Sequence, residues 1–296
     1  MISKILIIYP GGILCYSKTF VSEDKINDTF ISGFLTAISD IAKEIGGGEI
    51  KKVIFRNFNF VYSYDDEKRC MFTIVTDIKD PEEEVNAKLE LLKKEFMKRY
   101  YDDLKNWDFD TSRFESFDEF TEKNIFIPPK ILLIGEIGVG KTTIMNLFSS
   151  ETVIKLDDEM VEIVEKPIYL PIFREKNEIV LRELDMREIV ENPKIYNSLL
   201  NAAAAICIIT NSGGSNLGRT KRNLSIIQKR VKDVEFYIIA NFQDLENISF
   251  SPKEVEKMFG IKTFGFSAIE EDAKKKIVEI LIMIVNKTLV EKILDN

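Results

Sequence analysis

The segment from Lys130 to Phe148 constrains the fold of this chain more than any other. It reads KILLIGEIGVGKTTIMNLF: an apolar run of strand type, a glycine-rich loop ending in Lys-Thr, and a helix-forming run. Glycines allow such a loop to turn its backbone N–H groups toward a phosphate chain, and the N-terminus of the following helix adds the positive end of its dipole. The segment therefore predicts a phosphate-binding loop between a strand and a helix.

Two side chains of this loop have specific chemical roles in such a site. Lys141 is placed to neutralise the β- and γ-phosphates of a nucleotide, and the Thr142 hydroxyl is placed to coordinate Mg²⁺. Backbone groups of the loop supply the other phosphate contacts. The residues of this segment expected to contact nucleotide are Gly135, Gly138, Val139, Gly140, Lys141, Thr142 and Thr143.

Composition excludes several classes of function. A length of 296 residues with 45% hydrophobic content favours two domains, each with its own core. The net charge of −8 argues against nucleic-acid binding, which needs a basic surface. No histidine occurs, which removes Ser-His-Asp and Cys-His catalysis. Cys15, Cys70 and Cys207 lie in or beside apolar segments without metal-type spacing, which predicts buried, reduced thiols in a cytoplasmic protein.

The sequence predicts no direct membrane anchor. The apolar run at the N-terminus is too short for a signal peptide, and neither common lipidation pattern is present. The longest apolar stretch, 277–285, falls well short of the about 20 residues that span a bilayer. Any association with membranes is therefore expected to be peripheral and to go through partner proteins.

Seven elements are predicted in the first hundred residues. Their order is strand, strand, helix, three strands and a long helix, over the ranges 4–9, 13–16, 29–45, 50–56, 59–64, 70–77 and 80–104. Apolar residues at helical spacing predict the buried face of the first helix. That face comprises Phe30, Phe34, Ile38 and Ile41, widened by Leu35 and Ala42. Asp80 and Pro81 are typical of the cap and first turn that begin the long helix.

This order of elements resembles the longin domain, a profilin-like α+β fold, with the related roadblock domain as the neighbouring interpretation. The resemblance is one of element order and length over residues 1–105, and no residue motif carries it. Such domains are binding platforms in membrane trafficking and in the regulation of small GTPases. The resemblance therefore implies protein partners for this half of the chain, with a homodimer as one such assembly, and it implies no catalytic residues.

A linker is predicted over 106–129. Ser112-Arg-Phe-Glu115 is a capping-box pattern, and the residues after it predict a short helix with an aromatic stripe. The stripe consists of Phe114, Phe117 and Phe120. It either docks the linker against the core of one domain or couples the two domains. Pro128-Pro129 forms a short stiff spacer after it.

Strands alternate with helices through the remainder of the chain. The strands are predicted over 131–134, 178–184, 203–210, 235–240 and 262–266, and helices over 215–232 and 270–294. This alternation predicts an α/β domain over 130–296, with a largely parallel sheet covered on both faces and its ligand at the carboxyl ends of the strands.

Four segments follow the order found in small GTPases of the Ras, Rab and Arf superfamily, which this half resembles. The first is the phosphate-binding loop. The second is the strand ending at Asp185, 44 residues after Lys141. The resemblance implies that Asp185 holds Mg²⁺ through water, beside Thr142. The implied cofactors are therefore GTP or GDP and Mg²⁺.

The third and fourth segments concern the base. Asn241-Phe242-Gln243-Asp244 is similar to the family's Asn-Lys-x-Asp, and Ser267-Ala268 resembles its Ser-Ala element. The resemblance implies that Asp244 accepts hydrogen bonds from guanine N1 and the 2-amino group, while the backbone at 267–268 contacts guanine O6. Adenine does not supply both donors, so the wrong base leaves a carboxylate partly unpaired. Phe242 stands where the family has a base-packing lysine, and its ring is able to stack on a purine.

The regions that respond to the γ-phosphate depart from the family pattern. Met186-Arg187-Glu188 follows Asp185, where the family has Asp-x-x-Gly, and no glutamine follows nearby, through Pro193, to orient water. No threonine or serine occurs from Val153 to Leu184, which leaves Asp157 or Asp158 as substitutes unless both lie in a solvated loop. Arg187 either stabilises developing charge in cis or faces solvent. No catalytic residue is identified, and enzymatic activity is left open.

Three functions remain open from the sequence. The leading hypothesis is a guanine-nucleotide-binding protein, Arf-like or Rab-like, fused to a longin-like regulatory or partner-binding domain, with slow or absent GTP hydrolysis in a trafficking or signalling switch. The alternative is a non-hydrolysing pseudo-GTPase scaffold whose nucleotide is structural. A third hypothesis is an ATP-dependent enzyme of another phosphate-loop class.

Overall fold

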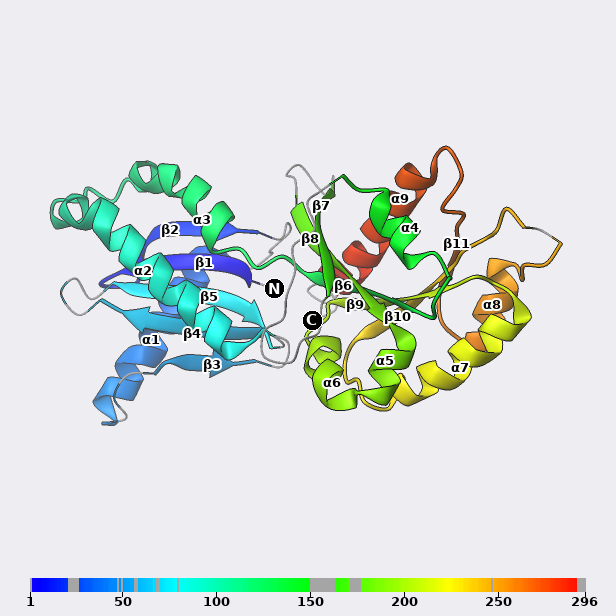
Figure 1. The fold of residues 1–296 in the computed structure, drawn as a ribbon. Helices are drawn as coiled ribbons and strands as arrows, with labels where there is room; N and C mark the ends of the chain where they lie inside the picture. The colour runs from blue at the N-terminus through cyan, green and yellow to red at the C-terminus, as the bar shows by residue number, and fades with distance from the viewer. Residues whose placement is uncertain are drawn as a thin grey trace. The chain divides into compact units, whose positions relative to one another are not determined.

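The chain has a mixed α/β architecture with two sheets in two compact units, Met1–Ile127 and Pro128–Asn296 (Figure 1). The computed structural model describes residues 2–20, 27–46, 48, 50–55, 58–65, 67, 70–78, 80–149, 163–170, 177–245 and 247–291. Each unit has buried hydrophobic clusters of its own on both faces of its sheet.

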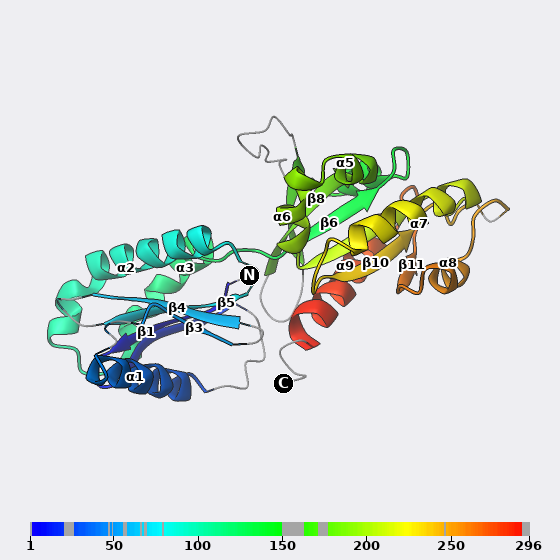
Figure 2. The same cartoon turned by 90° about the horizontal axis from the view of Figure 1, so that it is seen from below.

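The first unit is built on an antiparallel sheet with the strand order β2-β1-β5-β4-β3. One face is covered by α1 (Asp28–Glu44) and the other by α2 (Glu82–Lys105), as Figure 2 shows. All seven predicted elements are present in the predicted order. The strands are β1 (Ile2–Tyr9), β2 (Ile13–Thr19), β3 (Lys52–Ile54), β4 (Phe58–Tyr64) and β5 (Met71–Asp77).

The predicted buried face of α1 is confirmed at Leu35 and Ala42 and is wrong at Phe30, Phe34 and Ile41. Phe30 is 77% exposed and Ile41 59% exposed, whereas the helix packs through Ile31, Ser32, Leu35, Ser39 and Ala42. Two serines lie on the packed face because each has a hydrogen-bond partner there. Ser32 Oγ donates to the Gly12 carbonyl at 2.7 Å, and Ser39 Oγ accepts from the Tyr64 hydroxyl at 2.6 Å. Hydropathy alone cannot predict a face that contains satisfied hydroxyls.

Residues 106–127 belong to the first unit, so the division of the chain falls between Ile127 and Pro128. They form a 3₁₀ helix, η1 (Thr111–Phe117), and the short helix α3 (Asp118–Asn124). Phe114 and Phe117 are fully buried, with ring centroids 5.3 and 5.1 Å from that of Phe96 on α2. The aromatic stripe thus docks against the core of one domain, which was one of the two predicted alternatives.

Two predicted helix caps are wrong. Asp110 caps η1 by accepting the Ser112 N–H at 3.0 Å, so the turn begins before the predicted capping box. Asp80 turns back toward β5, where it accepts from the Thr76 hydroxyl and from the Asp77 N–H, and α2 begins without a side-chain cap. A carboxylate that has partners in the preceding strand end is not available to the helix.

The second unit is built on a sheet with the strand order β11-β10-β9-β6-β8-β7. All its pairs are parallel except that of β7 with β8, which is antiparallel. The largely parallel sheet is therefore confirmed, with the edge strand β7 as an addition. The strands are β6 (Lys130–Gly135), β7 (Val164–Leu170), β8 (Asn177–Asp185), β9 (Ala205–Thr210), β10 (Glu235–Ala240) and β11 (Thr263–Gly265).

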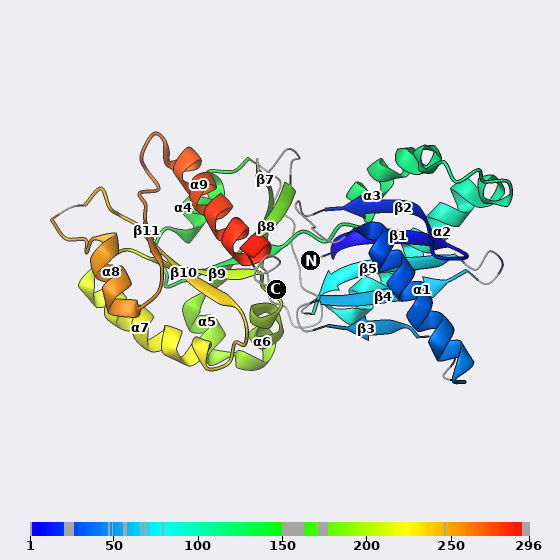
Figure 3. The same cartoon turned by 180° about the vertical axis from the view of Figure 1, so that it is seen from behind.

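Helices cover both faces of this sheet. On one face lie α4 (Lys141–Asn146) and α9 (Ala273–Val285), which continues as a π-helical turn over Asn286–Glu291 (Figure 3). The other face carries α5 (Met186–Glu191), α6 (Pro193–Asn201), α7 (Gly214–Gln228) and α8 (Pro252–Phe259). The sequence predicted α4, α7 and α9. It did not predict α5, α6 or α8.

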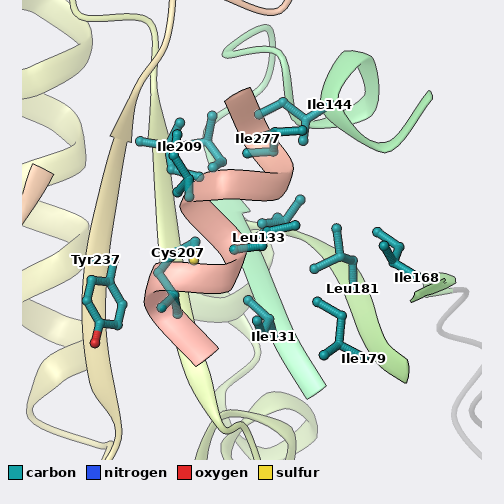
Figure 4. Close-up of a cluster of buried hydrophobic side chains, with 14 of the residues drawn as sticks. Ile131, Leu133, Ile144, Ile168, Ile179, Leu181, Cys207, Ile209, Tyr237 and Ile277 are labelled. Carbon is teal, nitrogen blue, oxygen red and sulfur yellow. The ribbon is translucent and has the colours of Figure 1, made fainter. Parts of the chain in front are cut away.

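The long apolar run of the last helix belongs to the core. Ile277 lies near Ile144 and Ile209 in the buried cluster beneath α9, and Leu281 and Ile284 are also fully buried (Figure 4). Among the described residues, no helix combines the length and the apolar character that crossing a bilayer needs.

All three cysteines are buried free thiols, as predicted. Burial raises the pKa of the Cys207 thiol to about 12 and raises that of Cys15 further. At neutral pH the thiols of Cys15 and Cys207 are therefore neutral packing groups rather than nucleophiles.

Candidate functional site

The strand register brings the predicted site segments to one edge of the second sheet. Gly135 at the end of β6 pairs with Asp185 at the end of β8, and Ala240 at the end of β10 pairs with Thr210 and Gly265. Because these strands are parallel, the loops that follow them leave from the same edge. In the sheet, β8 lies on one side of β6 and β9 on the other, so the strand order reverses at β6. Open α/β sheets bind ligands at the carboxyl ends of the strands where the order reverses.

The glycines of the loop after β6 are required by its geometry. A Cβ on Gly135 would lie 2.5 Å from the Ile209 carbonyl oxygen and 2.8 Å from Val139 Cγ2, so a side chain does not fit there. Gly138 and Gly140 have φ angles of +80° and +95°, a conformation that other residues adopt at a cost. The loop therefore turns tightly and exposes its backbone before α4 begins.

Lys141 lies across this loop with its ammonium group bonded to backbone oxygens. Its Nζ donates to the carbonyls of Gly135 at 2.8 Å and Glu136 at 3.0 Å, and the side chain is 7% exposed. Burial lowers the pKa of the ammonium group, while nearby carboxylates oppose this effect. Those carboxylates are Asp185, Glu183, Glu136 and Glu188. A buried cation held by neutral carbonyls is well placed to bind a phosphate group.

Thr142 and Thr143 are both exposed in the first turn of α4. The Thr142 hydroxyl donates to Glu183 Oε1 at 2.7 Å. Glu183 lies in β8 two residues before Asp185, so the two carboxylates lie on the same face of the strand. Glu183 is not among the residues that the sequence predicts for the site. The sequence feature that could have indicated Glu183 is the pair of acidic residues, Glu183 and Asp185, at alternating positions where the strand ends.

Asp185 caps the helix that follows it. Its Oδ1 accepts from the N–H groups of Arg187 at 2.8 Å and Glu188 at 3.4 Å, which begins α5. Among the described residues, no group of three or more carboxylate, thiol or imidazole side chains could hold a metal. The Thr142 hydroxyl and the Asp185 carboxylate nevertheless fit Mg²⁺ bound to a nucleotide, because this ion uses one or two protein oxygens together with phosphate oxygens and water.

Asn241 connects the phosphate-binding loop to the predicted base-binding segments. Its Nδ2 donates to the Val139 carbonyl at 3.0 Å, and its Oδ1 accepts from the Ala268 N–H at 3.1 Å. The side chain is 2% exposed, so both bonds are made in the interior. Three segments that are far apart in the sequence are therefore joined by one amide group.

The other base-segment residues surround this amide. Ser267 Oγ donates to Asp244 Oδ1 at 2.6 Å, which fixes the orientation of the carboxylate. Phe242 has a φ angle of +64°, and its ring edge lies 3.8 Å from the point where a Cβ on Gly140 would sit. The aromatic ring is thus held against the phosphate-binding loop. A bulky residue with positive φ is rare, and such strain concentrates at functional sites.

A buried polar network supports the 241–244 loop, and the sequence analysis missed it. Ser212 Oγ donates to the Asn241 carbonyl at 2.7 Å and accepts from Gln243 Nε2 at 3.0 Å. Beneath it, the Thr210 hydroxyl donates to Asn216 Oδ1 at 2.5 Å. No motif predicts these residues, because their partners come from different segments of the chain.

Glu188 and Arg187, which follow Asp185, each have a side-chain partner outside the glycine-rich loop. Glu188 accepts from the Tyr196 hydroxyl at 2.9 Å, and burial raises the pKa of that phenol to about 12, with Glu188 contributing. The Arg187 side chain is 63% exposed and lies 3.9 Å from Glu191, which favours the solvent-facing alternative. Asp157 and Asp158, the predicted substitutes for a switch hydroxyl, lie outside the described residues.

Comparisons with known proteins give no match for this chain, either to a protein-family model or to a curated protein. The interpretation of the site therefore depends on its residues and their geometry.

Proposed function

We propose that the second unit binds a guanine nucleotide with Mg²⁺, as a small-GTPase-like domain. The observation that carries the proposal is the double hydrogen bond of Asn241, to Val139 and to Ala268. It brings the loop suited to phosphates and the loop suited to a base to one edge of the sheet. A nucleotide needs both contacts at once, and a phosphate-binding loop alone would not supply the second.

In this proposal each group has a defined role toward the nucleotide. Lys141 exchanges its bonds to the Gly135 and Glu136 carbonyls for phosphate oxygens. Thr142 and Asp185 hold Mg²⁺, directly and through water. Asp244, oriented by Ser267, accepts the guanine N1 and 2-amino protons, and Phe242 covers the purine ring.

Base selectivity follows from the chemistry of Asp244. Asp244 is exposed in this structure, and a bound base would cover it. A carboxylate covered in this way needs its donors, and adenine offers none at position 2 and no proton at N1. The cost of leaving a charged group partly unpaired is about 1–3 kcal/mol or more. Release of bound nucleotide from the purified protein by denaturation, followed by mass spectrometry, tests this directly. GDP or GTP is the expected product, and ADP or ATP as the main species would contradict the proposal.

We infer that any GTP hydrolysis is slow without a partner. The residues directly after Asp185, from Met186 to Pro193, include no glutamine to orient water, Glu188 is bonded to Tyr196, and Arg187 faces solvent. Small GTPases that retain such groups already turn over at only about 4 × 10⁻⁴ per second. A quantitative phosphate-release assay on the purified protein should give a rate at or below this value, and brisk release without a partner would contradict the inference.

The first unit is proposed to be a longin-like platform for protein partners. Its element order and its sheet, with one helix on each face, support this, and so do the exposed side chains on α1. Phe30 and Ile45 are each 77% exposed and Ile41 is 59% exposed, an unusual concentration of apolar groups on one helix surface.

A second candidate function, a scaffold with a structural nucleotide, is favoured by the bond between Glu188 and Tyr196. This bond engages the residue that would have to respond to a γ-phosphate. Exchange of labelled nucleotide separates the two candidates. A switch exchanges its nucleotide and changes its protease sensitivity between the GDP and GTP states, whereas a scaffold retains its nucleotide and gives the same digestion pattern in both.

A further inference from the structure

Glu183 is a carboxylate in the second of the four segments, the strand that ends at Asp185, and the resemblance to small GTPases assigns it no role. It lies in β8 two residues before Asp185, and β8 packs against α4. Strand residues two apart share a face, so both acidic side chains are directed to the side of the sheet where α4 begins. Because α4 packs on this side of β8, Glu183 reaches Thr142 in the first turn of α4.

This contact fixes the rotation of the Thr142 hydroxyl. A hydroxyl group has one proton to donate and two lone pairs that accept. Thr142 donates its proton to Glu183 Oε1 at 2.7 Å, a length typical of a hydroxyl bonded to a charged carboxylate. The lone pairs of Thr142 Oγ1 therefore remain available to a cation. Without Glu183 the hydroxyl would be free to rotate and to donate elsewhere.

The charge of Glu183 also acts on any phosphate that binds here. The carboxylates of Asp185, Glu183, Glu136 and Glu188 are close enough to the Lys141 ammonium group to oppose the lowering of its pKa by burial. A nucleotide brings further negative charge to this region. Repulsion between these carboxylates and the phosphates opposes nucleotide binding. A divalent cation between them removes this effect, because the bound ion is then the largest local charge.

We propose that Glu183 is a positioning residue that makes nucleotide binding depend on a divalent cation. It holds the Thr142 hydroxyl in the orientation that coordinates the cation, and its charge weakens phosphate binding when the cation is absent. This inference rests on the proposed nucleotide-binding function. It predicts a site that takes up the nucleotide as its Mg²⁺ complex and releases it when the ion is removed.

The test is a titration of the full-length protein with a fluorescent GDP analogue, at a series of Mg²⁺ concentrations and in excess chelator. Removal of a residue that orients a metal ligand typically weakens metal binding about 10- to 100-fold. Glu183→Leu is therefore expected to raise the Mg²⁺ concentration at half-maximal GDP retention by about that factor. Glu183→Gln keeps the acceptor oxygen and loses the charge, so it should restore most of the Mg²⁺ response while binding GDP more tightly in chelator.

Two further variants separate positioning from a general structural effect. Glu178→Gln changes the same kind of side chain in the same strand, seven residues before the helix-capping Asp185, and should leave the Mg²⁺ requirement unchanged. Thr142→Val removes the hydroxyl that Glu183 orients. In that background, Glu183→Leu should produce no additional change in the Mg²⁺ requirement.

The outcomes distinguish the inference from the function on which it rests. Absence of GDP binding by the unsubstituted protein overturns both. If that protein binds GDP and Glu183→Leu retains the original Mg²⁺ requirement, the inference about Glu183 alone is overturned. If Glu183→Leu does not fold, Glu183→Gln decides: unchanged GDP affinity in chelator contradicts the role of the charge.

Discussion

The side-chain amide of Asn241 donates a hydrogen bond to the backbone carbonyl of Val139, 102 residues earlier in the chain, at 3.0 Å. The same side chain accepts from Ala268 N–H. Both bonds lie in the interior, so their loss leaves a carbonyl and an N–H without the partner that they have here. The arrangement of the proposed site is therefore sensitive to this one residue.

Asn241→Ala should lower the free energy of unfolding by about 1–3 kcal/mol, since buried groups lose their partners. If the binding free energy of GDP falls by a similar amount, GDP affinity should decrease about 10- to 100-fold. Urea denaturation and GDP titration measure the two effects. Asn201→Ala is the matched control, because Asn201 also bonds backbone groups but lies where α6 leads into the opposite end of β9. An equal loss of GDP affinity in the control would contradict a specific role for Asn241.

Gly135→Ala should destabilise the second unit. The added Cβ would meet the Ile209 carbonyl oxygen at 2.5 Å, which forces the backbone apart at a cost of about 1–3 kcal/mol. Gly218→Ala provides the control within α7, where an added Cβ has no atom within 4 Å. That change should instead stabilise the protein by up to about 1 kcal/mol. Thermal unfolding of both variants checks the prediction, which a stable Gly135→Ala protein would refute.

Asp244→Asn should change which base the site prefers. The substitution replaces an acceptor with a donor toward position 2 of the purine, which suits the carbonyl of xanthine rather than the amino group of guanine. GDP affinity should fall at least about tenfold while that for xanthosine diphosphate rises. Competition between the two nucleotides measures the switch. Unchanged affinity for GDP would show that Asp244 does not recognise the base.

Stability should decline as the pH rises above the ordinary tyrosine pKa of 10.0, in part through Tyr196. The folded state raises the pKa of this phenol to about 12, so the unfolded chain loses its proton first. The stabilising contribution is therefore complete below pH 10 and is lost as the pH rises toward the folded-state value. Tyr196→Phe should be less stable than the unsubstituted protein near neutral pH, and the difference should narrow at high pH. Urea midpoints at several pH values test this, and a constant difference would contradict it.

Elements with a strong local signal could be predicted from the sequence. The strands β6 and β9 are nearly continuous apolar runs, and β8 and β10 have apolar centres. The alternation of these strands with helices implies a parallel sheet. The face of α1 could not be predicted, because Ser32 and Ser39 are buried through partners on other elements.

In the site, too, features set by neighbouring residues could be predicted from the sequence, whereas contacts between distant residues could not. The glycine-rich loop after β6 follows a local sequence pattern, and its backbone geometry explains why glycines occur there. The contacts of Glu183 with Thr142 and of Ser212 with Asn241 join residues 41 and 29 positions apart. One acidic residue in a strand or one serine in a loop gives no sign of such a partner. Only the register of the sheet brings these side chains together.

The central claim, that the second unit binds a guanine nucleotide, is tested most directly by titrating the nucleotide-free protein with GDP and with ADP in saturating Mg²⁺, using calorimetry. The account predicts a Kd for GDP of about 1 μM or tighter. The affinity for ADP should be at least about 100-fold weaker, because adenine does not supply the two donors that guanine offers to Asp244. Equal or tighter binding of ADP would contradict guanine recognition, and no binding of either nucleotide would contradict the proposed function as a whole.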